Sequence, residues 1–175
     1  MTDWIKAANP MASITTEAEA TGAARASALA IFLGVIWGAV GVYFLVSGGS
    51  AEMQAAIAAA SADAPEMAGM GDFVMQIAMW SAIGVCVIQL VLGLVQWAKP
   101  NVVIPIIFVI LVAFKLLSGL FGMVMSGQEG AAEAAVPGWQ FYVGLVILVI
   151  QLDLHIAGIR GARALDRLRM EAARA

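Results

Sequence analysis

The distribution of apolar and polar residues along the chain is dominated by four long apolar stretches. They lie at about residues 28–46, 73–98, 102–125 and 136–159. Each is long enough to cross the hydrocarbon core of a bilayer as an α-helix, which takes about 20 apolar residues. Because backbone polar groups cannot stay unpaired in lipid, such a segment must be a helix rather than an open strand. The pattern therefore predicts an all-α integral membrane protein, a bundle of four transmembrane helices.

The composition agrees with this organisation of the chain. Hydrophobic residues make up 62% of the sequence and charged residues only 12%, against about 25% charged residues in soluble domains. Residues 28–160 are expected to form one transmembrane domain, between a partly helical cytoplasmic segment at 1–27 and a basic cytoplasmic tail at 161–175. Thr16 and Glu19 have the spacing of a capping box, so the first helix is expected to begin before the membrane.

The basic residues indicate the orientation. The segments that follow the first and third stretches, 48–72 and 126–135, contain acidic residues but no lysine or arginine. All basic residues outside the stretches therefore fall on the other side, which is the cytoplasmic side under the positive-inside rule. We expect a multi-pass protein of the bacterial inner membrane with both termini in the cytoplasm. A signal peptide cleaved near Ser47 is the alternative, but the first stretch exceeds the usual apolar length of about 7–15 residues.

A short internal similarity suggests a repeat. Residues 87–92 read Val-Ile-Gln-Leu-Val-Leu and residues 149–154 read Val-Ile-Gln-Leu-Asp-Leu, in two stretches expected to run toward the cytoplasm. Two tandem helical hairpins of parallel orientation would explain the match. Chance similarity between segments rich in Val, Ile and Leu would explain it equally well. If the repeat is real, Gln89 and Gln151 occupy equivalent positions and hydrogen-bond across a central interface.

Small residues mark two candidate packing faces. In the first stretch, Gly34 and Gly38 form a G-x-x-x-G pattern extended by Gly41, which lets a second helix approach closely. A similar face in the third stretch consists of small residues that share helical spacing with Lys115. Its members are Ser118, Gly119 and Gly122. Lys115 is therefore expected to point toward another helix rather than toward lipid.

Lys115 is the only charged residue deep in an apolar stretch. A charge at the bilayer centre costs about 2.5–3.5 kcal/mol on insertion scales, so a partner is expected. Asp153 in the next stretch is the best candidate, although helical rise places it about 11 Å nearer the cytoplasm. The pair would be either an ion-responsive part of a pathway or a clamp that fixes helix register. Alternatively, Asp153 lies at the cytoplasmic interface and pairs with Arg160.

His155 is the only histidine and Cys86 the only cysteine. We expect His155 to be a hydrogen-bonded side chain near the interface; the alternative is a ligand to a cofactor held by a larger complex. One histidine cannot hold a haem through two of the chain's own histidines, and one His with one Asp makes an incomplete metal site. We therefore expect bound lipid but no metal or other cofactor. No phosphate loop or nucleophile–base arrangement indicates a catalytic residue.

The tail after the fourth stretch is rich in arginine and is expected to continue the fourth helix. Four of its arginines are candidates for contact with anionic lipid or a partner protein. They are Arg160, Arg163, Arg167 and Arg169. Without a pattern for catalysis or nucleic-acid binding, the leading hypothesis is a non-catalytic accessory or scaffold subunit of a larger membrane complex. The alternative is a small, self-associating transporter or channel that uses Lys115 and Asp153.

Overall fold

The described parts of the chain are almost entirely helical. The structure, a computed structural model, describes residues 4–47, 70–126 and 138–174. Five helices and no strand lie in these ranges. The helices are α1 (Trp4–Ala8), α2 (Glu17–Val46), α4 (Met70–Ala98), α5 (Val103–Ser126) and α6 (Trp139–Ala172). The all-α prediction is therefore confirmed.

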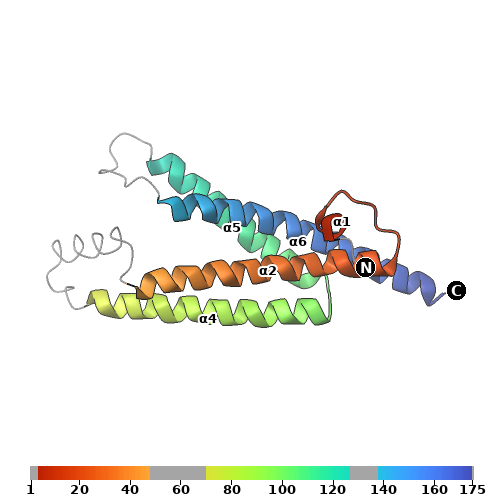
Figure 1. The fold of residues 1–175 in the computed structure, drawn as a ribbon, viewed down its shortest axis with the longest axis horizontal. Coiled ribbons are helices and arrows are strands. Elements are labelled where there is room, and N and C mark those ends of the chain that lie inside the picture. Colours follow the sequence, from red (N-terminus) through yellow and green to blue (C-terminus); the bar gives the residue numbers. More distant parts are fainter. Residues whose placement is uncertain (1–3, 48–69, 127–137, 175) are drawn as a thin grey trace.

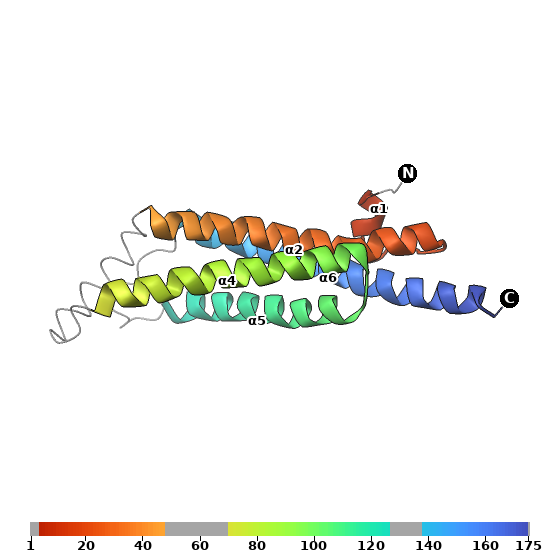
Figure 2. The same ribbon diagram turned by 90° about the horizontal axis from the view of Figure 1, so that it is seen from below.

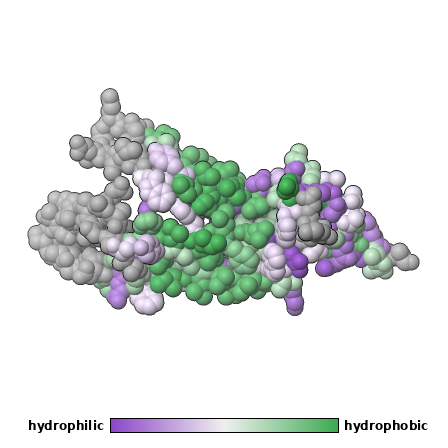
Figure 3. Space-filling view, in the orientation of Figure 1, coloured by the Kyte–Doolittle hydropathy of each residue, from purple (hydrophilic) through white to green (hydrophobic). Residues whose placement is uncertain are grey.

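Four of these helices, α2, α4, α5 and α6, are long and apolar enough to cross a membrane. Figure 3 shows a broad apolar band across the face of the bundle that it draws, with hydrophilic residues gathered at the end that carries the chain termini. We call this end the terminal end and the opposite one the far end. The predicted bundle of four spans is confirmed. Of the acidic connections expected at 48–72 and 126–135, residues 48–69 and 127–135 lie outside the described residues.

Helices α2 and α6 form the central pair of the bundle. Helix α4 packs mainly against α2, and α5 packs mainly against α6, whereas α4 and α5 pack little against each other. The bundle thus consists of two helix pairs joined through α2 and α6. Figures 1 and 2 show that both pairs run along the long axis, and Figure 1 shows that they converge at the terminal end and separate toward the far end.

Helices α2 and α6 come into close backbone contact at two glycines of α6. A Cβ atom placed on Gly158 would lie 2.5 Å from Ser27 Cβ and 3.2 Å from Ser27 N. A Cβ atom on Gly161 would lie 2.5 Å from the carbonyl carbon of Ala23 and would also clash with the backbone nitrogen of Ala24. Two helix backbones come this close only where side chains are absent or small. Gly158 and Gly161 therefore set the crossing of the central pair.

Larger side chains separate the two helices toward the far end. There the indole nitrogen of Trp37 would lie 3.4 Å from a Cβ atom placed on Gly144. Closer still to the far end, the rings of Phe44 and Trp139 pack edge to face, with their centroids 6.2 Å apart. Because small residues join the helices at one end and aromatic rings keep them apart at the other, the two helix pairs form a wedge.

A buried amide ties the turn between α4 and α5 to α2. Gln96 is fully buried, and its Nε2 donates to the carbonyl oxygens of Ala24 at 3.3 Å and Asn101 at 3.1 Å. Its Oε1 accepts from the Asn101 N–H at 3.3 Å. Asn101 Oδ1 in turn accepts from the N–H groups of Val103 and Ile104, both at 3.0 Å, and so caps the first turn of α5.

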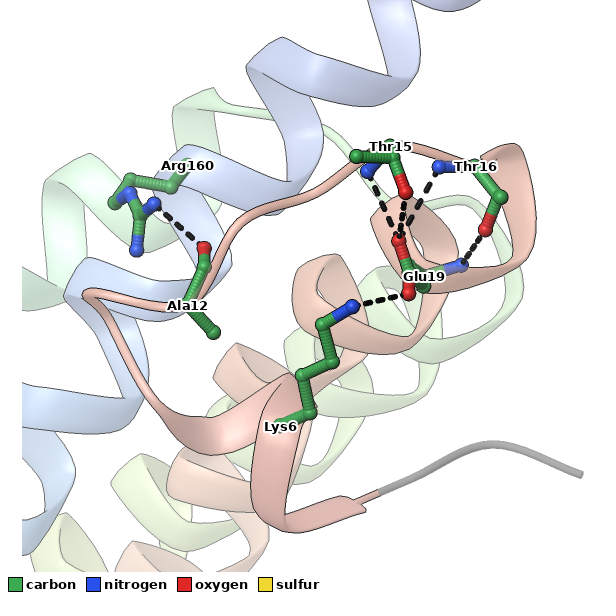
Figure 4. A network of polar contacts seen from close by, with 6 residues as sticks. All are labelled: Lys6, Ala12, Thr15, Thr16, Glu19 and Arg160. Atoms are coloured by element: carbon green, nitrogen blue, oxygen red, sulfur yellow. Dashed lines mark hydrogen bonds and ion pairs between the residues drawn. The ribbon is translucent and has the colours of Figure 1, made fainter.

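The segment between α1 and α2, residues 9–16, forms a strap at the terminal end (Figure 4). The Glu19 carboxylate accepts hydrogen bonds from the N–H and the hydroxyl of Thr15, both at 2.9 Å, and forms an ion pair with Lys6. Thr16 Oγ1 accepts from the Glu19 N–H at 3.2 Å, which completes the predicted capping box. Glu19 therefore connects α1, the strap and the first turn of α2.

Further contacts connect this end of the chain to α4 and α6. Arg160 Nη2 donates to the Ala12 carbonyl oxygen at 2.9 Å, as Figure 4 shows. Trp4 of α1 stacks on Trp97 of α4, with ring centroids 6.0 Å apart. The Arg25 guanidinium lies 5.2 Å from the centroid of Trp97 and donates to its carbonyl oxygen at 3.2 Å. The terminal end is thus a packed unit to which three of the long helices contribute.

Glu19→Ala is expected to open the strap and leave the four long helices intact. The substitution removes the carboxylate that accepts from Thr15 and pairs with Lys6, and exposed backbone held by few contacts opens locally at low cost. Hydrogen–deuterium exchange should become severalfold faster at residues 9–16 and stay unchanged in α5. Glu17→Ala is the control, because the side-chain contact of Glu17 among the described residues is an exposed ion pair with Arg169. Equal exchange in the two variants would contradict the role of Glu19.

Candidate functional site

A cleft lies between the two helix pairs, halfway along the bundle. Its volume is about 690 Å³, and all four long helices contribute to its lining. Most of the lining side chains are apolar. The polar ones include Trp37 of α2, Ser81 and Gln89 of α4, Lys115 of α5 and Gln151 of α6. A mainly apolar cavity of this size with a few polar groups is the usual form of a small-molecule site, so this cleft is the candidate site.

Two glutamine amides meet at Gly34 of α2. A Cβ atom placed on Gly34 would lie 2.5 Å from Gln151 Nε2 and 3.4 Å from Gln89 Oε1. Gln151 Nε2 also donates to the Ala30 carbonyl oxygen at 3.0 Å. The predicted hydrogen bond between the two glutamines is not among the contacts of the described residues. The missing side chain of Gly34 makes room for both amides, one from α4 and one from α6.

Lys115 lies about midway along α5 and lines the cleft together with Gln151. In the part of the chain that the structure describes, the ion pairs do not include one between Lys115 and Asp153, and both side chains are exposed. Two residues turn a helix by about 200°, so Asp153 and Gln151 lie on opposite sides of α6. The structure therefore places Lys115 at the cleft and Asp153 away from it. The Arg160 side chain bonds to Ala12 instead of Asp153.

The G-x-x-x-G face of α2 packs against side chains rather than against another backbone. A Cβ atom on Gly38 would lie 2.6 Å from the Cys86 sulfur of α4, while one on Gly41 would have open space around it. Gly34 contacts the two glutamines. Gly34 and Gly38 therefore line the cleft, whereas Gly41 does not, and the close helix crossing lies elsewhere, at Gly158 and Gly161.

The second predicted packing face, on α5, is only partly covered. A Cβ atom on Gly119 would lie 3.4 Å from Leu145 Cδ2, so this glycine packs on α6. Ser118 and Gly122 are exposed, and a Cβ atom on Gly122 would meet nothing within 4 Å. Part of this face therefore remains free within the described bundle.

His155 is fully buried where α6 meets α2 and α5. Its Nδ1 lies 2.7 Å from the Ser27 hydroxyl, and its ring stacks on Phe108 with the centroids 5.3 Å apart. A hydrogen bond of the expected kind is present, and the side chain lies inside the bundle. Its Nε2 has no hydrogen-bond partner among the described residues. In the same ranges, no group of three or more His, Cys, Asp or Glu side chains could hold a metal ion.

The four arginines of α6 divide into two kinds. Arg160 donates to the strap, and Arg169 Nε donates to the Glu17 carboxylate of α2 at 3.1 Å. Arg163 and Arg167 are exposed, and the Arg167 ion pair with Glu171 of the same helix is a long one of 3.8 Å. Two arginines thus hold the terminal end together, and two present their charge to the surroundings.

Sequence reasoning did not single out several residues that shape the cleft and the crossing. Trp37 and Phe108 line the cleft, and Ser27 bonds to His155 across the central pair. Gly158 and Gly161 set the crossing. Their spacing of three residues, opposite the alanine-rich start of α2, was a signal that could have found them. Nothing in the local sequence distinguishes Trp37 and Phe108 from lipid-facing aromatic residues.

The four long helices define a polytopic membrane protein of the helical-bundle class. Comparisons with protein families, with curated proteins and with solved structures find no match to this chain. The arguments about function therefore rest on the cleft and on the terminal end.

Proposed function

We propose that the protein is a non-catalytic accessory or scaffold subunit of a larger assembly in the bacterial inner membrane. The observation that carries the proposal is the length of α6 past its span. With 34 residues, α6 is about 51 Å long at about 1.5 Å per residue, whereas the hydrocarbon core is about 30 Å thick. Its last turns therefore stand in water, where a partner protein can bind them.

The projecting part of α6 is held in place rather than free to move. Arg169 pairs with Glu17 at the start of α2, and Arg160 bonds to the strap. Arg163 and Arg167 lie four residues apart, on neighbouring turns of one helix face, and both are exposed. A fixed pair of exposed cations fits an acidic surface on a partner subunit, and complementary charge favours specific association.

The orientation is part of the same proposal. The acidic connections and the basic terminal end support a topology with both termini in the cytoplasm under the positive-inside rule. The projection of α6 would then meet its partner on the cytoplasmic side. Anionic headgroups on that side are the competing contact for Arg163 and Arg167.

Charge reversal at both Arg163 and Arg167 to Glu is expected to detach the partner while the bundle stays folded. Because both side chains are exposed and neither is a core contact, the change acts on association rather than on packing. Gentle solubilisation of the native membrane, affinity purification and mass spectrometry should recover a stoichiometric partner with the wild type. The double variant should recover about tenfold less of it.

Arg174→Glu is the control, because Arg174 is an exposed arginine of the same tail and the substitution reverses the charge at one position, half the change of the double variant. A reporter fused to the C-terminus should read cytoplasmic in all variants, since loss of arginine can alter topology. Equal recovery of the partner from the double variant would contradict the proposed contact. Purification of the wild type without any other protein would contradict the accessory role.

A second candidate function is transport by a small self-associating carrier or channel. The observation that favours it is the cleft, where Gln89, Gln151 and Lys115 place polar groups at mid-depth. Polar and charged residues inside a membrane commonly mark a pathway. Asp153 lies away from this cleft and is not part of such a path. Recovery of a homo-oligomer alone in the purification above would favour this function over the accessory role.

A further inference from the structure

We infer that the cleft binds a single-chain carboxylic acid of the membrane, such as a free fatty acid, with the carboxylate at Lys115 and the chain along the apolar walls. This site is independent of the partner contact proposed for α6. The inference rests on the Lys115 ammonium in the cleft, which has no ion-pair partner among the described residues, on the hydrogen-bond donors in the same lining and on the apolar walls.

The charge of Lys115 indicates the charge of the ligand. Lys115 lines the cleft and has no ion pair or hydrogen bond to another described residue. An ammonium group has three donors and no acceptor, and charges within a membrane nearly always have partners. A ligand carboxylate supplies the missing negative charge and makes the site neutral overall. Two like charges would repel, so a second copy of the chain docking on the same face would bring another Lys115 and is disfavoured.

The other polar groups of the cleft fit an oxygen acceptor. Gln89 has no hydrogen bond to another described residue, so its NH₂ group is available, and the Trp37 indole N–H belongs to the same lining. A carboxylate has two oxygens with about four acceptor positions in total, more than one lysine can fill. Gln151 already donates to the Ala30 carbonyl oxygen of α2, so we do not assign it to the ligand.

The apolar walls and the depth of Lys115 indicate a single chain. The walls include Ile31 of α2, Val85 of α4, Leu111 of α5 and Leu148 of α6. Lys115 lies twelve residues after the first residue of α5, about 18 Å along the helix, whereas a phospholipid phosphate stays in the headgroup region of the bilayer. The volume of about 690 Å³ falls within the range of small-ligand sites, about 300–1,000 Å³. Because α4 and α5 pack little against each other, a chain can enter between them from the bilayer.

Photo-crosslinking tests this site on the full-length protein in nanodiscs. The probe is a long-chain fatty acid with a diazirine on its chain, and mass spectrometry identifies the labelled peptides. We expect saturable labelling of the peptides that contain Val85 and Leu111. Unlabelled palmitate should compete, and the corresponding fatty alcohol, which has no carboxylate, should compete about tenfold less well.

Lys115→Met should weaken apparent binding of the probe about tenfold or more, and Lys115→Arg should largely restore it, because the charge is kept. Lys99→Met is the control, since Lys99 is an exposed lysine in the turn between α4 and α5, outside the cleft. Size-exclusion profiles and helical content should match across the variants. Labelling that is not saturable, equal binding by Lys115→Met, or equal competition by the alcohol would each overturn the inference. Because these measurements use the isolated protein, their failure leaves the purification test of the accessory role unaffected.

Discussion

Gly161→Ala should separate the two halves of the bundle, although it adds a single methyl group. The new Cβ atom would lie 2.5 Å from the carbonyl carbon of Ala23, 2.7 Å from Ala23 Cβ and closer still to the backbone nitrogen of Ala24. Overpacking of a tight contact costs about 1–3 kcal/mol when side chains can adjust. Here the obstacle includes backbone, which cannot rotate away, so we expect about 3 kcal/mol of lost unfolding free energy. Equilibrium unfolding in mixed micelles, followed by circular dichroism, measures the loss.

Gly122→Ala is the matched control for this prediction. It makes the same chemical change near the C-terminal end of α5, where nothing lies within 4 Å of the added atom. Alanine is a better helix former than glycine by about 0.8–1.0 kcal/mol, so this variant should be as stable as the wild type or more stable. If Gly161→Ala unfolded at the same point as Gly122→Ala, the crossing would not be where the structure places it.

Gln96→Leu should destabilise the protein by about 3 kcal/mol. The substitution keeps the side chain about as large but leaves the Asn101 N–H and the Asn101 carbonyl oxygen without their partner. It also removes the second hydrogen bond of the Ala24 carbonyl oxygen, which keeps its helical bond within α2. A buried polar group without a partner costs about 1–3 kcal/mol, and Gln96 itself is fully buried. Differential scanning fluorimetry in detergent should show a lower melting temperature, and amide exchange at Asn101 should become faster.

Gln76→Leu is the control on the same helix. It shows how much stability changes when a glutamine side chain is replaced by leucine without loss of hydrogen bonds to other described residues. Gln76 is exposed and has no hydrogen bond to another described residue, so replacing it should change stability by less than about 0.5 kcal/mol. A similar loss in both variants would show that the amide bonds at Gln96 do not hold the turn to α2.

The spans were readable from the sequence because the bilayer imposes them. The length of an apolar stretch, the pairing of backbone groups and the capping of a helix are local properties, so the four helices and the Thr16–Glu19 cap could be predicted. The continuation of the fourth helix into the arginine-rich tail could also be predicted from neighbouring residues, and α6 does run to Ala172. Each of these features depends on residues within a few turns of one another.

The site could be predicted only in part, because helix contacts in a membrane join residues far apart in sequence. Gln89, Gln151 and Lys115 stood out as polar residues in apolar stretches, and all three line the cleft. Which helix each would meet could not be read locally. Pairing Lys115 with Asp153 assumed that both face a shared interface, whereas Asp153 lies across α6 from the cleft. The crossing at Gly161 depends on alanines nearly 140 residues earlier in the chain.

Helix α6 is continuous on both sides of the glycine crossing, and this continuity gives it the geometry of a lever. The fulcrum is at Gly158 and Gly161, with an arm of about 29 Å toward Trp139 and one of about 17 Å toward Ala172 at about 1.5 Å per residue. A tilt that widens the wedge moves the Trp139 end of α6 away from α2 and moves the Ala172 end in the opposite direction. Such a tilt would act first on the Arg169–Glu17 pair, the exposed contact near the tip of the short arm.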